Sequence, residues 1–155
     1  MINDLLNEAA AAGVEVRTHV FGSSRLKGLY IDNVITLNSK ALTSLSETVC
    51  ILAEELGHHY TGYGNILNLR DIRSRKQEKR ARNWGYERLV TLFGFVQAFE
   101  SGARNRFEIA EFLGVTETYI DESIKHYQEK YGLYTTIENY IIYFEPLRIG
   151  KLFES

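Results

Sequence analysis

The sequence predicts an α+β fold, with a small antiparallel sheet packed on a helical core, further helices behind it and a short hairpin. Three observations support this prediction. Apolar and polar residues alternate over residues 14–20, as in a half-buried strand. Apolar residues recur at helical spacing over residues 44–60. Tyrosine, isoleucine and threonine are frequent over residues 134–144, which favours strands.

The N-terminal part is expected to contain one helix and three strands. Residues 3–12 form the helix, and Gly13 ends it. The alternating strand follows. Residues 28–31 and 34–37 are two more strands, joined by the pair Asp32-Asn33, which tolerates turn geometry.

Helices are predicted for most of the remaining chain. Ser44 or Ser46 can cap a helix that runs to about residue 60. We expect residues 1–90 to form the core and residues 91–155 a helical subdomain packed on it. The later elements are a charged helix at residues 74–90, helices at 91–100, 106–113 and 116–131, and a closing hairpin at 134–144.

Composition and charge argue against several classes of partner. The chain has 155 residues with 18 basic and 20 acidic side chains, so its net charge of -2 gives no overall attraction to nucleic acid or anionic membranes. The single cysteine, Cys50, cannot form an intrachain disulfide. No signal peptide is recognisable, and no apolar run approaches the roughly 20 residues that span a bilayer. We therefore expect a cytoplasmic protein with no membrane partner.

The most informative stretch is AEELGHHY at residues 53–60, which nearly matches the pattern H-E-x-x-H of zinc peptidase helices. Glu54 occupies the first ligand position, Glu55 the position of the general base and His58 the second ligand position. Residues 54 and 58 are i and i+4, so their side chains project from one helix face at a separation that one ion can bridge. The alternative interpretation is a solvated polar helix face.

A second register is possible, because Glu55 and His59 are also i and i+4. That register would put Leu56 where the general base belongs. We therefore prefer His58 as the ligand and His59 as an imidazole at the edge of the core, beside the ligands.

A third ligand should come from a neighbouring helix, and Glu78 is the best candidate. Residues 78, 81 and 85 are Glu, Ala and Gly, so small side chains line the helix face that carries the carboxylate. Such a face would let the two helices approach closely. The alternative is an exposed Glu78 paired with Arg82 at i+4.

Three strings in this order resemble the ImmA/IrrE family of metallo-endopeptidases, which is common in prophages and mobile elements. They are GLYIDNVITLN at 28–38, LAEELGHHY at 52–60 and QEKRA at 77–81. The likeness covers about residues 14–90 and extends more loosely to the C-terminal helices. It implies a zincin-like, metallopeptidase-like core at residues 1–90 and zinc-dependent cleavage of a protein, often the repressor that silences the element.

By position, the resemblance makes Glu54, His58 and Glu78 the metal ligands and Glu55 the general base. Two carboxylates and one imidazole bring a charge of -2, which weakens the metal as a Lewis acid relative to two histidines and one carboxylate. Oxygen ligands also favour harder ions. Zn²⁺ is the expected metal, and Mn²⁺ or another divalent ion, reduced activity or no metal are the alternatives. The oxyanion could be stabilised by the metal or by a tyrosine: Tyr60, Tyr63 or Tyr86.

The string FEIAEFLGVTETYI at residues 107–120 resembles a helix-turn-helix, with the hairpin at 134–144 as a wing. Four basic and six acidic residues lie between residues 104 and 131, and the recognition helix would open with Glu117, Asp121 and Glu122. Acidic side chains there oppose a phosphate backbone, so the pattern favours packing or partner recognition over DNA binding.

The one basic concentration lies at residues 70–82, and it is interpreted as a solvated helix face or as a docking site for an acidic partner or nucleic acid. Two functions follow from the sequence. The first is a metallo-endopeptidase that cleaves a regulatory protein. The alternative is a weak or inactive regulator that keeps the peptidase fold and binds a repressor or DNA.

Overall fold

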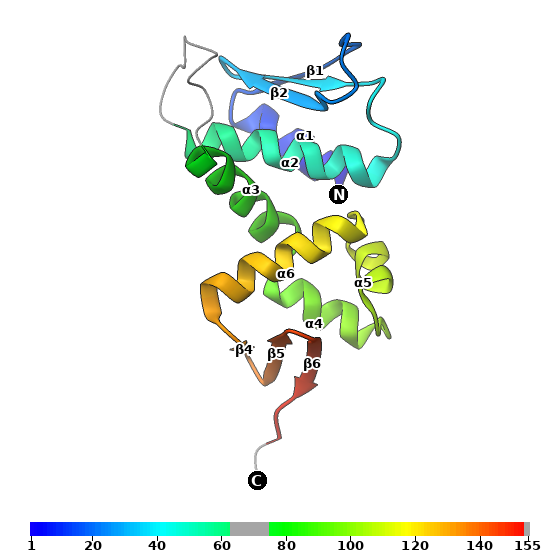
Figure 1. Cartoon of the computed structure of the whole chain (residues 1–155), viewed down its shortest axis with the longest axis vertical. Coiled ribbons are helices and arrows are strands. Elements are labelled where there is room, and N and C mark those ends of the chain that lie inside the picture. The colour runs from blue at the N-terminus through cyan, green and yellow to red at the C-terminus, as the bar shows by residue number, and fades with distance from the viewer. Residues whose placement is uncertain (63–74, 154–155) are drawn as a thin grey trace. The chain divides into compact units, whose positions relative to one another are not determined.

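A computed structural model describes residues 1–62 and 75–153 of the chain. Within these ranges the chain forms six helices and six strands, which confirms the predicted α+β class (Figure 1). The chain divides into two compact units, Met1–Gly85 and Tyr86–Ser155. Among the described residues, no helix combines the length and the apolar character needed to cross a membrane.

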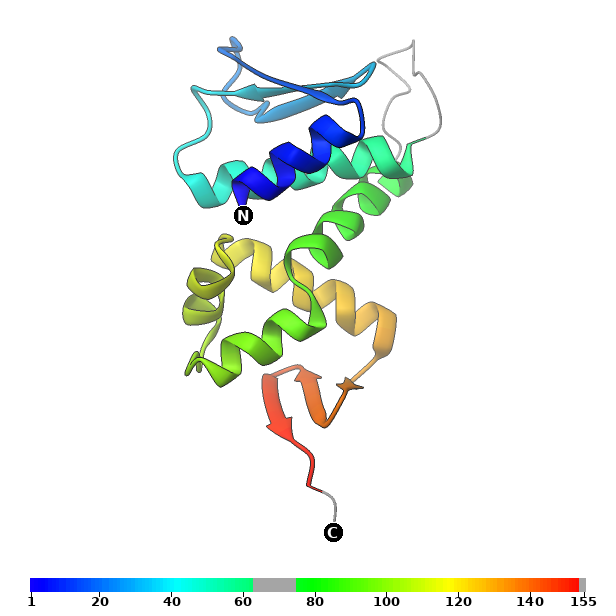
Figure 2. The same cartoon turned by 180° about the vertical axis from the view of Figure 1, so that it is seen from behind.

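The first unit places two helices against one three-stranded sheet. Both views of the ribbon show α1 and α2 on the same face of the sheet (Figure 2). The start of α3 (Arg75–Leu89) completes the described part of the unit. The other elements are α1 (Ile2–Ala11), β1 (Glu15–His19), β2 (Gly28–Ile31), β3 (Val34–Asn38) and α2 (Leu45–Thr61).

The sheet has the strand order β1-β3-β2 and is mixed. The hairpin β2–β3 is antiparallel, and its turn residues Asp32 and Asn33 have φ values of 48° and 63°, as the predicted turn requires. β1, in contrast, pairs parallel with β3, so the expected antiparallel pairing is wrong for β1. β3 has the buried Ile35 and Leu37 and takes the central place, while residues 20–27 carry the chain across the end of β3 to the far edge.

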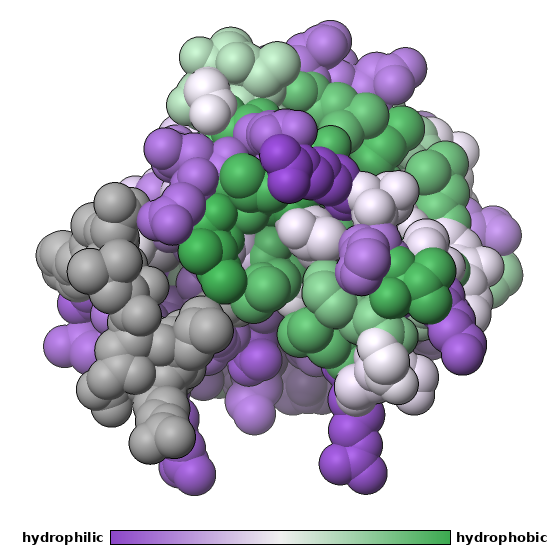
Figure 3. Space-filling model, turned by 90° about the horizontal axis from the view of Figure 1, so that it is seen from above, coloured by the Kyte–Doolittle hydropathy of each residue, from purple (hydrophilic) through white to green (hydrophobic). Residues whose placement is uncertain are grey.

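The outer face of this sheet carries residues that are only partly covered. Cross-strand pairing places Leu29 beside Thr36 and Ile31 beside Val34. Figure 3 views the molecule from this side and shows hydrophobic residues gathered between hydrophilic ones. The inner face, in contrast, carries Ile35 and packs on the helices.

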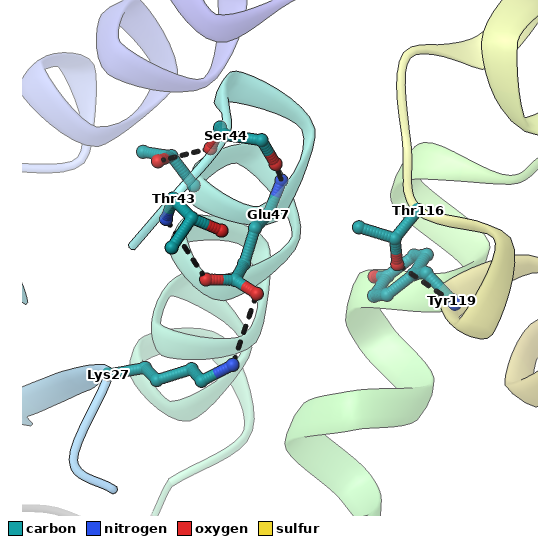
Figure 4. A network of polar contacts seen from close by, with 7 residues as sticks. Lys27, Thr43, Ser44, Glu47, Thr116 and Tyr119 are labelled. Carbon is teal, nitrogen blue, oxygen red and sulfur yellow. Dashed lines mark hydrogen bonds and ion pairs between the residues drawn. The ribbon is translucent and has the colours of Figure 1, made fainter. Parts of the chain in front are cut away.

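The start of α2 is fixed by a network of polar contacts (Figure 4). Ser44 is the N-cap and accepts a hydrogen bond from the backbone N–H of Glu47 at 3.1 Å. The Glu47 carboxylate accepts from the backbone N–H of Thr43 and forms an ion pair with Lys27 at 3.1 Å. This reciprocal capping selects Ser44 over Ser46 and ties α2 to the segment that leads into β2.

The second unit consists of three helices and a three-stranded antiparallel sheet, together with the end of α3. The predicted hairpin is confirmed as β4–β5, and β6 extends it. β6 was not predicted, although Leu147 and Ile149 alternate with Arg148 and Gly150, because this alternation is short and rich in glycine and basic residues. The elements are α4 (Leu92–Glu100), α5 (Arg106–Leu113), α6 (Glu117–Tyr131), β4 (Tyr134–Ile137), β5 (Tyr140–Phe144) and β6 (Leu147–Lys151).

A tight turn joins α5 to α6. Gly114 ends α5 with a φ of 73°, a left-handed conformation that favours glycine. Ala110 and Val115 are buried on either side of it, and Thr116 caps α6 by accepting from the N–H of Tyr119 at 3.1 Å (Figure 4). Together these residues fix the turn between the two helices. The helix-turn-helix function of the segment stays a prediction.

Candidate metal centre

Three acidic or imidazole side chains from two helices converge in the first unit. Glu54 and His58 lie one turn apart on α2, and Glu78 lies in the first turn of α3. One potential ligand atom from each lies within 4.8 Å of the other two. His58 Nε2 and Glu78 Oε2 are 3.5 Å apart. Within the described ranges this is the one cluster of three such residues that could hold a metal ion, and it unites the three residues predicted as ligands.

The convergence depends on a close contact between the backbones of α2 and α3. A Cβ atom at Gly57 would lie 2.2 Å from the carbonyl oxygen of Ala81, so only glycine fits at this position. Ala81 is fully buried and Gly85 is buried too, which confirms the predicted face of small residues on α3. This contact brings Glu78 to the side chains of α2.

The three side chains of the site are largely shielded from solvent, and two of them are carboxylates. His58 has a relative exposure of 8%, and the Glu54 and Glu78 side chains are 24% and 21% exposed. Burial raises the pKa of the Glu54 carboxyl above its ordinary value, and Arg82 opposes this shift more strongly than Glu78 reinforces it. Burial thus makes ionised Glu54 less favourable than it is in water, and a bound cation would offset part of this cost.

The sequence predicts only part of the surroundings of Arg82. Its Nη2 lies 3.9 Å from Glu78 Oε2, as the expected i+4 pair predicts. Its Nε also lies 3.4 Å from Glu54 Oε1 on the other helix. The arginine thus contacts carboxylates from both α2 and α3, a contact that depends on how closely these helices cross.

Glu55 lies on a different face of α2 from Glu54 and His58. It is 4% exposed, and a Cβ at Gly28 would lie 3.3 Å from Glu55 Oε1. The carboxylate is therefore beside the first residue of β2, an edge strand of the sheet. This position suits a residue that handles a proton near the ligands without being one of them, and the role of general base stays a prediction.

His59 is held by the sheet and not by the ligand cluster. Its Nδ1 lies 2.6 Å from the hydroxyl of Tyr30, which is also 3.1 Å from Asn33 Oδ1. Tyr30 was not anticipated from the sequence; its position on the inward face of β2, opposite Ile35, was the available signal. This contact agrees with the choice of His58 over His59 as the ligand.

The three candidate tyrosines have different surroundings. Tyr60 stacks on Trp84 of α3, with ring centroids 4.9 Å apart. Tyr63 lies outside the described residues. Tyr86 belongs to the second unit, where its hydroxyl donates to Glu122 at 2.9 Å. A role in stabilising an oxyanion stays a prediction for all three.

The arrangement is metallopeptidase-like: one helix carries two candidate ligands, the next helix carries a third, and a small sheet precedes them. The family model of the IrrE N-terminal-like domain, Peptidase_M78, matches residues 9–125. The chain therefore belongs to this peptidase family, and the resemblance inferred from the three sequence strings is confirmed. No curated protein and no solved structure matches the chain.

The residues of the site fit a divalent metal. One imidazole nitrogen and two carboxylates form a set of the kind that binds Zn²⁺, and carboxylates also suit Mn²⁺. Two negative side chains in a largely buried site favour a cation among them. A divalent metal is therefore the expected cofactor.

Proposed function

We propose that the chain is a cytoplasmic metal-dependent endopeptidase that cleaves a regulatory protein, such as the repressor of a phage or mobile element. The observation that carries this proposal is the convergence of Glu54, His58 and Glu78 on two neighbouring helices, in a chain of a peptidase family. Endopeptidases of this design need a metal held by two helices and a carboxylate that moves a proton.

Glu54, His58 and Glu78 would hold the metal, and Zn²⁺ is the first expectation with Mn²⁺ as the alternative. When bound, such an ion polarises a peptide carbonyl and makes water easier to deprotonate. Two of the three ligands carry negative charge, which weakens this effect relative to a site with two histidines. Hydrolysis slower than that of such a site is the expected consequence.

Glu55 would take a proton from the attacking water and give it to the leaving amine. Its carboxylate lies beside Gly28, at the start of edge strand β2. A substrate that pairs with the edge of β2 that faces no described strand would bring an extended peptide near Glu55. Extended, locally unfolded segments are therefore the expected cleavage sites.

A second function is favoured by one specific contact. Arg82 already supplies a positive charge to Glu54 and Glu78, so the cluster has a counterion without a metal. A chain that stays in this state would be a peptidase-fold regulator that binds a repressor or DNA and does not cleave it.

Metal analysis and a single substitution separate the two functions. The protein is purified without chelator, its metal content is measured by mass spectrometry, and it is incubated with a library of proteome-derived peptides. We expect one divalent ion per chain in both the wild type and Glu55→Gln, and cleavage by the wild type alone. A metal-free protein with the same peptide profile in both forms would overturn the enzymatic function.

A further inference from the structure

The guanidinium of Arg82 and a metal ion would use the same carboxylates. Arg82 Nε lies 3.4 Å from Glu54 Oε1, and Nη2 lies 3.9 Å from Glu78 Oε2. The same Glu78 oxygen is 3.5 Å from His58 Nε2. A cation bound among the three ligands would therefore meet a positive charge next to both of its carboxylates.

The side chain of Arg82 is also placed so that it can move away from the two carboxylates. Its side chain is 52% exposed, and its contacts with the carboxylates are longer than the roughly 2.7–2.9 Å of a strong charged hydrogen bond. Glu54 and Glu78, in contrast, are only 24% and 21% exposed, and the helices that carry them meet at Gly57. The guanidinium therefore has more room to move than the two carboxylates.

We propose that Arg82 is a built-in counterion of Glu54 and Glu78 that competes with the metal and so sets the metal affinity of the site. The inference rests on the proposed metal site and adds a means of regulating it. Occupation by Arg82 and occupation by a divalent ion are linked, so each weakens the other by the same factor. With Arg82 in place, its single positive charge offsets part of the charge of the two carboxylates, and a higher concentration of free metal is needed to load the site.

The chain contains its own probe of this competition. Trp84 is the single tryptophan, and it stacks on Tyr60 between α3 and α2, one turn or less from Arg82. Titrating ZnCl₂ into the metal-free, full-length protein and recording tryptophan fluorescence gives the dissociation constant. A chromophoric chelator in competition provides an independent value, and the midpoint of thermal unfolding is recorded with and without zinc.

Three variants isolate the charge of Arg82. Arg82→Gln keeps most of the side-chain length and removes the charge, while Arg82→Lys keeps the charge. Lys76→Gln removes the same charge from an exposed position in the first turn of α3. We expect Arg82→Gln to bind Zn²⁺ about tenfold more tightly than the wild type, from the loss of two partly exposed ion pairs. Arg82→Lys and Lys76→Gln should stay within about threefold of the wild type.

The outcomes distinguish this inference from the proposed function. If the wild type binds zinc and Arg82→Gln binds it no more tightly than Lys76→Gln, Arg82 is no competitor and the metal site stands without it. Weaker binding by Arg82→Gln would make Arg82 a residue that positions the ligands, which also overturns the inference. If neither Zn²⁺ nor MnCl₂ binds to any variant, both the inference and the metal-dependent function fail.

Discussion

Two helix pairs of the molecule, α2–α3 and α5–α6, are built by similar means and place different chemistry at their contact. In the α2–α3 pair, Gly57 lets the backbones meet, and acidic side chains gather beside the contact. In the α5–α6 pair, Gly114 turns the chain and the acidic Asp121 faces Arg106 at 2.9 Å. The first contact brings two carboxylates together beside one arginine, and the second pairs one carboxylate with one guanidinium.

The difference shows where a functional site is to be sought. Burying two carboxylates beside each other opposes folding unless a cation compensates them, so such a cluster is not expected from packing alone. A surface pair such as Arg106–Asp121 contributes little and needs no functional explanation.

Gly57→Ala should break the α2–α3 contact. Its Cβ would lie 2.2 Å from the carbonyl oxygen of Ala81, and a backbone group cannot move aside as a side chain can. We expect a loss of about 3 kcal/mol in the free energy of unfolding, despite a gain of up to about 1 kcal/mol in helix propensity. Urea denaturation measures the loss.

Gly22→Ala is the matched control, because no atom lies within 4 Å of a Cβ at Gly22 and its backbone is not left-handed. It should change stability by no more than about 0.5 kcal/mol. Zinc binding should be weakened in Gly57→Ala and unchanged in Gly22→Ala. A Gly57→Ala protein with the stability of the wild type would mean that the helices do not meet here.

Glu54→His should strengthen zinc binding, because it restores the usual ligand and lowers the negative charge of the set from -2 to -1. We expect an increase in affinity on the order of tenfold, measured by competition with a chromophoric chelator. Mn²⁺ affinity should fall, because manganese prefers oxygen ligands. Unchanged or weaker zinc binding would mean that Glu54 is not a ligand.

The sequence predicted much of the fold because local signals determine it. Ser44, Asn105 and Thr116 cap helices whose starts depend on neighbouring residues alone. The turn between β2 and β3 likewise follows from the local pair Asp32-Asn33. The parallel pairing of β1 could not be predicted from local signals. The alternation of apolar and polar residues shows which face of a strand is buried and not which strand it pairs with.

The candidate site also combines residues that the sequence predicted with contacts that it did not. Glu54 and His58 follow from helical spacing, and Glu78 from the small residues of its own helix face. The contact of Arg82 with Glu54 and that of Tyr30 with His59 join residues 28 and 29 positions apart. Such contacts depend on how the helices and strands cross, which no single segment of sequence encodes.

Tyr127→Phe tests whether buried polar contacts in the second unit are structural. The Tyr127 hydroxyl donates a buried hydrogen bond to the carbonyl of Val90 at 2.7 Å. Burial raises the pKa of this hydroxyl, so it stays a donor throughout the physiological range. We expect a loss of about 1 kcal/mol in the free energy of unfolding and no change in zinc affinity. A change in zinc affinity would contradict the separation of structural and functional polar contacts.

The smallest effect is expected for the ion pair that Arg106 forms with Asp121. Both side chains are substantially exposed, at 39% and 48%, so water and salt screen their attraction. A double-mutant cycle of Arg106→Ala and Asp121→Ala should give a coupling energy of about 0.5 kcal/mol that decreases as salt is added. A coupling energy above about 2 kcal/mol would mean that Arg106 and Asp121 interact as strongly as buried charges do. Clustered charge would then no longer distinguish the α2–α3 pair from the α5–α6 pair.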